Sequence, residues 1–147
     1  MTRAEKAKEN FFNGYNCSQA VFTAFADLLG LDDITAKKVS MGMGGGMGRL
    51  REVCGAVSAG AMILGAIYGG ENSDDRASAY EKIQQFAQEF KQKNNSIICR
   101  ELLGLDKNAK ISPIPDSRTK EYYQVRPCPN KVYEAAKILE KMIASEC

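Results

Sequence analysis

The sequence contains no histidine and no tryptophan among its 147 residues. Without histidine, the chain lacks the most common general base, the Ser–His and Cys–His nucleophilic pairs, and every metal site that needs an imidazole ligand. Chemistry in this protein must therefore depend on cysteine, carboxylates, tyrosine, lysine or a bound cofactor.

Short-range cysteine pairs and a strong net charge are also missing. The five cysteines include no C-x-x-C pair, so neither a thioredoxin-type motif nor a zinc finger or ribbon is supported. Lys plus Arg is 20 and Asp plus Glu is 18, for a net charge of +2. This balance gives no electrostatic reason to expect nucleic acid or an anionic membrane as a partner. The N-terminal residues lack the apolar segment of a secretory signal, so we expect a cytoplasmic location.

One uncharged span, Val53 to Gly70, is long enough to raise the question of a transmembrane helix. It consists largely of Gly, Ala and Ser, with few large side chains. This composition favours the buried central helix of a helical bundle over a membrane span. We therefore expect no membrane insertion.

Helical spacing of apolar residues dominates the chain, and no segment shows a convincing strand pattern. The pattern predicts helices over residues 3–12, 17–29, 34–41, about 50–68, about 75–93, 97–103 and from 129 onward. The helix that follows Ser73 and Asp74 is expected to bury a stripe of Ala77, Tyr80, Ile83, Ala87 and Phe90. Residues 105–127 contain three of the four prolines, which predicts a long surface loop.

The length and this pattern predict a single helical domain over residues 1–147. The fold class is all-α, with five or six helices packed around the small-residue helix.

Four of the five cysteines fall at predicted helix N-termini, namely Cys17, Cys54, Cys99 and Cys128. A helix N-terminus stabilises an anion by about 0.3–1 kcal/mol, which lowers a thiol pKa by up to roughly one unit. Thiolates are the nucleophiles of redox exchange and the ligands of soft metals. The alternative is that these cysteines are small buried apolar residues. Cys147, the last residue, is left out of the set.

The glycine-rich stretch MGMGGGMG, Met41 to Gly48, precedes Cys54. It matches neither a P-loop nor G-x-G-x-x-G. It is either a flexible connection or a tightly packed backbone whose N–H groups face an anion beside Cys54. Arg49 and Arg51 would add positive potential there. The candidate cofactor-binding glycines are Gly44, Gly45, Gly46 and Gly55.

The order NCSQAV, GGMG before EVCGAVSAG, CRELLG and a last cysteine before a helix resembles a family of proteins described as redox-active. The family is named for a cysteine, a Cys-Gly-Ala-x-x-Gly type motif and two further cysteines. The resemblance covers nearly the whole chain and falls on Cys17, Cys54, Cys99 and Cys128. In this chain Ala59 stands at the motif's second glycine, and Gly60 follows.

The arrangement is also similar to the iron–sulfur domain of split-Soret cytochromes. Haem attachment is excluded here, because the chain has no C-x-x-C-H motif.

Two hypotheses share the same four cysteines as metal ligands or catalytic thiols. In the first, they hold an iron–sulfur cluster, with [2Fe–2S] favoured, for electron transfer. In the second, they form one or two reversible disulfide pairs without metal. The long irregular spacing disfavours a structural zinc site, and a helical interaction module with incidental cysteines is the remaining alternative. An electron carrier and an oxidoreductase both stay open, as do a homodimer and the identity of the redox partner protein.

Overall fold

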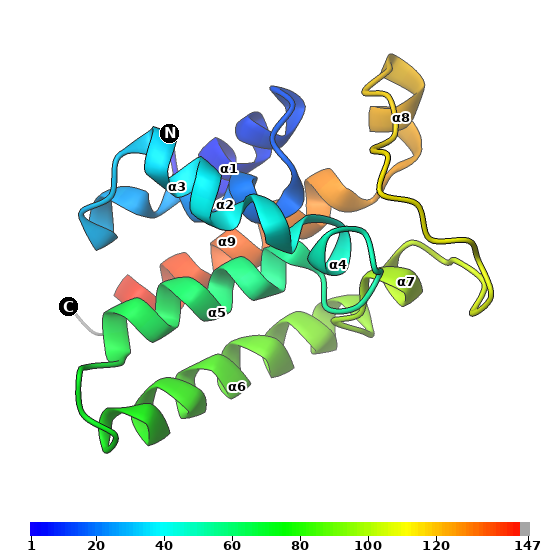
Figure 1. Cartoon of the computed structure of the whole chain (residues 1–147). Helices are drawn as coiled ribbons and strands as arrows, with labels where there is room; N and C mark the ends of the chain where they lie inside the picture. Colours follow the sequence, from blue (N-terminus) through cyan, green and yellow to red (C-terminus); the bar gives the residue numbers. More distant parts are fainter. Residues whose placement is uncertain (145–147) are drawn as a thin grey trace.

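The computed structural model describes residues 1–144 and confirms an all-α fold for that part of the chain (Figure 1). Within it, six α-helices have eight residues or more: α1 (Arg3–Phe12), α2 (Cys17–Ala24), α3 (Asp33–Ser40), α5 (Gly55–Tyr68), α6 (Asp75–Asn94) and α9 (Cys128–Ala144). The shorter segments are the 3₁₀ helices η1 (Ala26–Leu29) and η2 (Met41–Met43), and the helices α4 (Gly44–Met47), α7 (Cys99–Leu102) and α8 (Lys120–Val125).

Helix α5 lies at the centre of the bundle, packed against α2, α6 and α9. Its small residues allow this close approach. A side-chain carbon at Gly60 would overlap the ring of Phe86, so that ring rests directly on the α5 backbone. The predicted small-residue central helix is confirmed. It begins at Gly55 rather than near residue 50, since Arg49 and Arg51 have positive φ values and Val53 pairs with Ile98.

The core is one contiguous cluster built around four phenylalanines, Phe11, Phe25, Phe86 and Phe90. Each of these side chains is at most 1% exposed, and burial of such a ring contributes about 1.5–3 kcal/mol. Phe11 lies in α1, Phe25 directly follows α2, and Phe86 and Phe90 lie in α6. Helices α5 and α9 are therefore packed between these elements. No helix of the described residues is long and apolar enough to span a membrane.

Two predicted helical patterns are corrected by the structure. Helix α2 ends at Ala24, because Phe25 leaves helical geometry at φ −117° and ψ 4°, and a 3₁₀ turn carries the chain to Gly30. In α6 the predicted stripe has the wrong start: Tyr80 is 55% exposed, whereas Ala79 is buried. The buried face of α6 follows Ala79, Phe86 and Phe90, because Phe86 is the residue that fits against Gly60.

The predicted loop over residues 105–127 contains α8 and is anchored to the bundle. Arg118 donates hydrogen bonds to the carbonyl oxygens of Phe11 (3.1 Å) and Tyr15 (3.0 Å). Its guanidinium also lies 4.4 Å from the centre of the Phe11 ring. The segment is therefore laid across the end of α1, beside the cavity described below.

Candidate functional site

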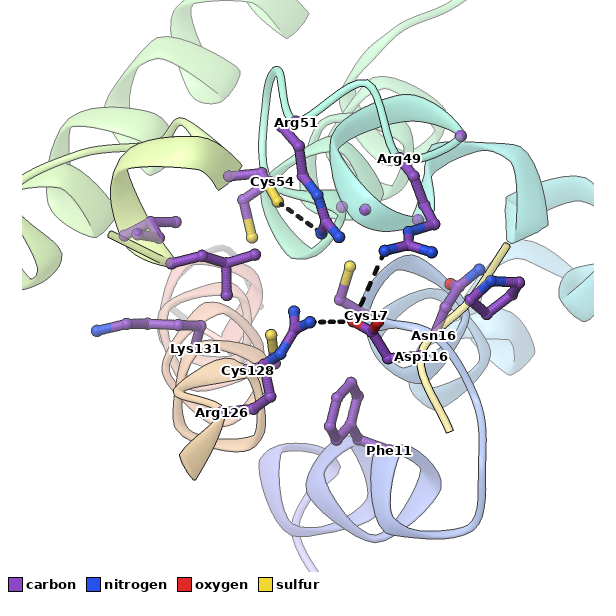
Figure 2. Close-up of a pocket in the computed structure, with 18 of the residues that line it drawn as sticks. Phe11, Asn16, Cys17, Arg49, Arg51, Cys54, Asp116, Arg126, Cys128 and Lys131 are labelled. Atoms are coloured by element: carbon purple, nitrogen blue, oxygen red, sulfur yellow. Dashed lines mark hydrogen bonds and ion pairs between the residues drawn. The ribbon is translucent and has the colours of Figure 1, made fainter. Parts of the chain in front are cut away.

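The four cysteines of the predicted set line one cavity of about 380 Å³. Cys17, Cys99 and Cys128 are the first residues of α2, α7 and α9, and Cys54 immediately precedes α5. The expected position at helix N-termini is thus confirmed for all four. Figure 2 shows the side chains of Cys17, Cys54 and Cys128 directed into the same space from different elements. Cys147 lies outside the described residues.

An antiparallel backbone contact brings Cys54 and Cys99 together. Val53 and Ile98 form an isolated bridge, flanked by hydrogen bonds from Cys54 N–H to Ile97 (2.8 Å) and from Cys99 N–H to Glu52 (2.6 Å). Both cysteines are one residue from the bridging pair, so alternation along extended backbone directs them to the same side. Residues 45 apart in the chain therefore face one cavity.

The glycine-rich stretch forms an ordered left-handed turn. Gly45, Gly46, Met47, Gly48 and Arg49 have successive φ values of 64°, 70°, 70°, 57° and 69°. Glycine adopts this region freely, whereas each other residue loses roughly 1–2 kcal/mol in it. The turn closes with hydrogen bonds from the N–H groups that follow it back to its glycine carbonyls. Of the two alternatives for this stretch, the structure favours the tightly packed backbone.

The candidate glycines form the wall of the cavity or pack behind it. Gly44, Gly45 and Gly55 line the cavity. A side-chain carbon at Gly55 would lie 2.5 Å from the Cys17 sulfur, and one at Gly46 would lie 2.9 Å from Cys99 Cβ. The absence of side chains at these positions lets the backbone approach the thiols directly.

Cys17 has the electrostatics of a stabilised thiolate. The thiol of Cys54 donates a hydrogen bond to it, and the backbone N–H groups of Gly45, Gly55 and Ser18 add to this effect. Together they overcome burial and lower the pKa of Cys17 to about 6. The glycine-rich turn was expected to face an anion beside Cys54. The Gly45 N–H group stabilises the Cys17 thiolate, which is such an anion.

The other three thiols stay protonated. Cys54 donates a hydrogen bond to the Cys17 sulfur and is buried beside it. Both effects raise the pKa of Cys54 well above its ordinary value. Burial raises the pKa of Cys99, opposed by Arg51, whose Nη1 lies 3.6 Å from the Cys99 sulfur. Burial and the neighbouring Cys17 charge raise the pKa of Cys128 to about 11. A lowered pKa at each helix N-terminus is therefore wrong for these three, because desolvation outweighs the helix terminus.

The thiols are grouped around a space and do not converge on a point. Among the described residues, no three cysteines or carboxylates come close enough together to hold a single metal ion. Cys17 and Cys54 form a close pair through their S–H···S hydrogen bond, and Cys99 and Cys128 complete the lining. This geometry does not suit a tetrahedral zinc site, whose four ligands surround one ion.

Several lining residues were not predicted from the sequence. Asp116 forms ion pairs with Arg49 and Arg126, as the dashed lines in Figure 2 show. Tyr122 also faces the cavity, and burial raises its pKa. Arg126 could have been found from its position two residues before Cys128. Tyr122 stands out in the sequence only as a tyrosine of the long loop near Cys128, and the sequence favours a packing role for it. Asp116 carries no local signal, because the path of the chain before α8 places it.

Comparison with known proteins shows the family of the chain. The chain matches the family model described as "Putative redox-active protein (C_GCAxxG_C_C)" over residues 15–142. That stretch contains Cys17, Cys54, Cys99 and Cys128, in keeping with the four cysteines of the family designation. The designation gives the second motif as Gly-Cys-Ala-x-x-Gly, so the order Cys-Gly-Ala expected from the sequence was wrong. Around Cys54 this chain has Val53, Gly55 and Ser58 where the designation has Gly, Ala and Gly. No curated protein and no solved structure matches the chain.

Proposed function

Because this chain belongs to the C_GCAxxG_C_C family of redox-active proteins, we propose that its four-cysteine cavity holds an iron–sulfur cluster for electron transfer. The proposed ligands are Cys17, Cys54, Cys99 and Cys128. When bound, such a cluster supplies one-electron transfer that the side chains alone do not provide. The supporting observation is the grouping of four thiols around one cavity, with one close pair and two further thiols.

This grouping favours [2Fe–2S] over a single ion. In a [2Fe–2S] site four thiolates are shared between two metal atoms, so the ligands need not converge on one point. Cys17 and Cys54 interact closely, and Cys99 and Cys128 would supply the remaining two ligands.

The surroundings of the sulfurs support this assignment. Buried thiolates need hydrogen-bond donors, which the backbone of Gly45 and Gly55 supplies to Cys17 and the Arg51 guanidinium supplies to Cys99. N–H···S contacts of this kind also set the reduction potential of an iron–sulfur site. In this scheme the absence of side chains at Gly44 and Gly46 lets neighbouring residues pack closely at the cavity wall.

The test is anoxic purification followed by a visible spectrum and iron and sulfide analysis. We expect about two irons and two sulfides per chain, the content of one [2Fe–2S] cluster. Serine substitution of any of the four cysteines should abolish or destabilise the chromophore. Cys147→Ser is the matched control and should keep it. A colourless, iron-free protein from strictly anoxic cells and buffers would overturn the proposal.

One observation favours a second candidate, thiol–disulfide exchange at Cys17 and Cys54. A thiolate in contact with a protonated thiol is the arrangement that exchange requires. The Cys17 thiolate would attack a substrate disulfide, forming a mixed disulfide and releasing one substrate thiolate. Cys54 would then lose its proton and attack the Cys17 sulfur. That step releases the second substrate thiol and leaves a Cys17–Cys54 disulfide, so the substrate gains two electrons.

This candidate has its own test. A metal-free Cys54→Ser variant should accumulate the mixed disulfide on Cys17, because the second attack is blocked. The matched Cys99→Ser variant should not. Intact-mass analysis with an aromatic disulfide as substrate measures both. Equal behaviour of the two variants would contradict the exchange scheme.

A further inference from the structure

Two arginines stand at the mouth of the cysteine cavity. The side chains of Arg49 and Arg126 are 19% and 21% exposed. Cys54 and Cys99 are buried, and Cys17 and Cys128 are partly exposed. Arg49 ends the left-handed turn, and Arg126 comes just before α9. Figure 2 shows both guanidinium groups beside the space that the thiols face. These two cations therefore line the same cavity as the thiols.

Asp116 lies between the two arginines and satisfies them incompletely. Both guanidinium groups contact the same oxygen, Oδ2, with Arg49 at 3.6 Å. The Nη1 atom of Arg49 is buried and has no hydrogen-bond partner. A buried charged donor left without a partner is costly, and the planar guanidinium fork matches a carboxylate held through both oxygens. Arg49 therefore retains donor capacity that Asp116 does not fill.

The other cations of the cavity are engaged elsewhere. Arg118 is held by backbone carbonyls, Lys131 donates to Asn94 (2.5 Å) and Arg51 donates to Cys99. The described residues that line the cavity include five cations, namely these three and the two arginines at its mouth. They include one carboxylate, Asp116. The cavity mouth therefore has an excess of positive charge.

The backbone holds Arg49 in an unfavourable conformation. Its φ of 69° lies in the left-handed region, which a non-glycine residue adopts at a cost and which Met47 and Arg51 of the same stretch share. Asp116, by contrast, is 46% exposed and lies in the stretch between α7 and α8, with no helix of its own. The arginine is fixed and strained, while the carboxylate stands on the more exposed segment.

We propose that Arg49 and Arg126 form the binding site for the carboxylate of a small anionic substrate, and that Asp116 occupies this site as an internal stand-in. The substrate displaces Asp116 and gains the unfilled donors of Arg49, which brings it to the mouth of the cavity beside the thiols. As a statement about a redox substrate, the inference rests on the proposed function. The anion site itself requires only the arginines.

The test is isothermal titration calorimetry of the protein as purified, with malonate as the probe and neutral malonamide as its matched analogue, at constant ionic strength. Malonate should bind and malonamide should not. Asp116→Asn removes the internal competitor and should tighten malonate binding by about tenfold, the value of one charge-assisted hydrogen bond. Asp106→Asn makes the same charge change in the same segment and should alter binding less than about twofold.

The arginine side of the site has a matched pair of its own. Arg49→Gln should weaken malonate binding by at least about tenfold, while Lys110→Gln, on the exposed part of the same segment as Asp116, should change it little. If circular dichroism shows that Arg49→Gln is unfolded, the comparison of Asp116→Asn with Asp106→Asn decides alone.

Equal binding of malonate and malonamide would overturn the inference, as would equal effects of the two Asp→Asn variants. Calorimetry does not depend on iron, so its outcome is separate from the iron and sulfide analysis. Specific malonate binding by an iron-free protein would leave the anion site standing while removing the cluster.

Discussion

Gly55 lies directly against Cys17, so that a side-chain carbon at position 55 would stand 2.5 Å from the Cys17 sulfur. The N–H group of the same glycine is one of the donors that stabilise the Cys17 thiolate. One residue thus provides both the space and part of the charge compensation for the sulfur. The most acidic thiol of the cavity depends on the missing side chain of its neighbour.

Gly55→Ala should therefore displace the Cys17 sulfur from its donors. Overpacking of this kind costs about 1–3 kcal/mol of unfolding free energy. In the metal-free, reduced variant, Cys17 should also react more slowly with iodoacetamide at pH 7. Gly65→Ala is the control on the same helix, because a side chain there meets nothing within 4 Å. The Gly65→Ala variant should leave the free energy of unfolding unchanged or raise it by up to about 1 kcal/mol. Equal urea stability of the two variants would contradict this contact.

The pH dependence of Cys17 alkylation should be shifted to acid in the metal-free, reduced protein. A lowered pKa means that the reactive thiolate is already formed above about pH 6, whereas an ordinary thiol has a pKa of about 8.5. The rate should therefore rise through about pH 6 and be level by about pH 8. Mass spectrometry of the labelled Cys17 peptide measures the profile.

Two variants of Cys54 test the cause of that shift. Cys54→Ala removes the hydrogen-bond donor and should move the Cys17 midpoint to higher pH. Cys54→Ser keeps a donor and should retain most of the shift. A midpoint that is unchanged in Cys54→Ala would show that the S–H···S bond is not responsible.

Arg51→Gln should make Cys99 less reactive. The guanidinium of Arg51 opposes the burial that raises the pKa of Cys99, so its loss raises that pKa further. At pH 8 the rate of Cys99 alkylation should fall by up to about tenfold, the value of one hydrogen bond to a charged group. Arg76→Gln, on the exposed face of α6, serves as the control and should leave the rate as it is.

Gly60→Ala should destabilise the fold without acting on the thiols. The added carbon would overlap the Phe86 ring, which has no free space because it is fully buried. We expect a loss of about 1–3 kcal/mol from this overpacking, measured by urea unfolding. The Cys17 alkylation profile should stay at its wild-type midpoint. A changed midpoint would show that the packing of α5 on α6 also sets the site.

The sequence predicts the helices and the cysteine positions well because both depend on local signals. Asn16 caps the helix that Cys17 begins, through a reciprocal pair of hydrogen bonds with Gln19, and these residue types are recognisable along the chain. The small residues of α5 identify the central helix in the same way. The periodicity of apolar residues predicted the wrong start for the buried stripe of α6. The contact between Phe86 and Gly60 determines which face of α6 is buried.

The charge state of the four thiols cannot be predicted from the local sequence. All four thiols stand at helix N-termini, yet only Cys17 has a lowered pKa, because burial and the donors that reach each sulfur are set by tertiary packing. Asp116 reaches the cavity across a stretch of chain with no regular structure. The bridge between Val53 and Ile98 is a single pair, too short to leave a strand pattern in the sequence.

The central claim, that Cys17, Cys54, Cys99 and Cys128 hold one iron–sulfur redox site, is tested most directly by electron paramagnetic resonance. The protein is purified without oxygen, reduced with dithionite and measured beside its iron content. We predict a signal that integrates to about one spin for every two irons, as a reduced [2Fe–2S] site gives, and its loss in Cys17→Ser. A protein that is silent after reduction, contains no iron and offers all four thiols to a titrating reagent would contradict the claim.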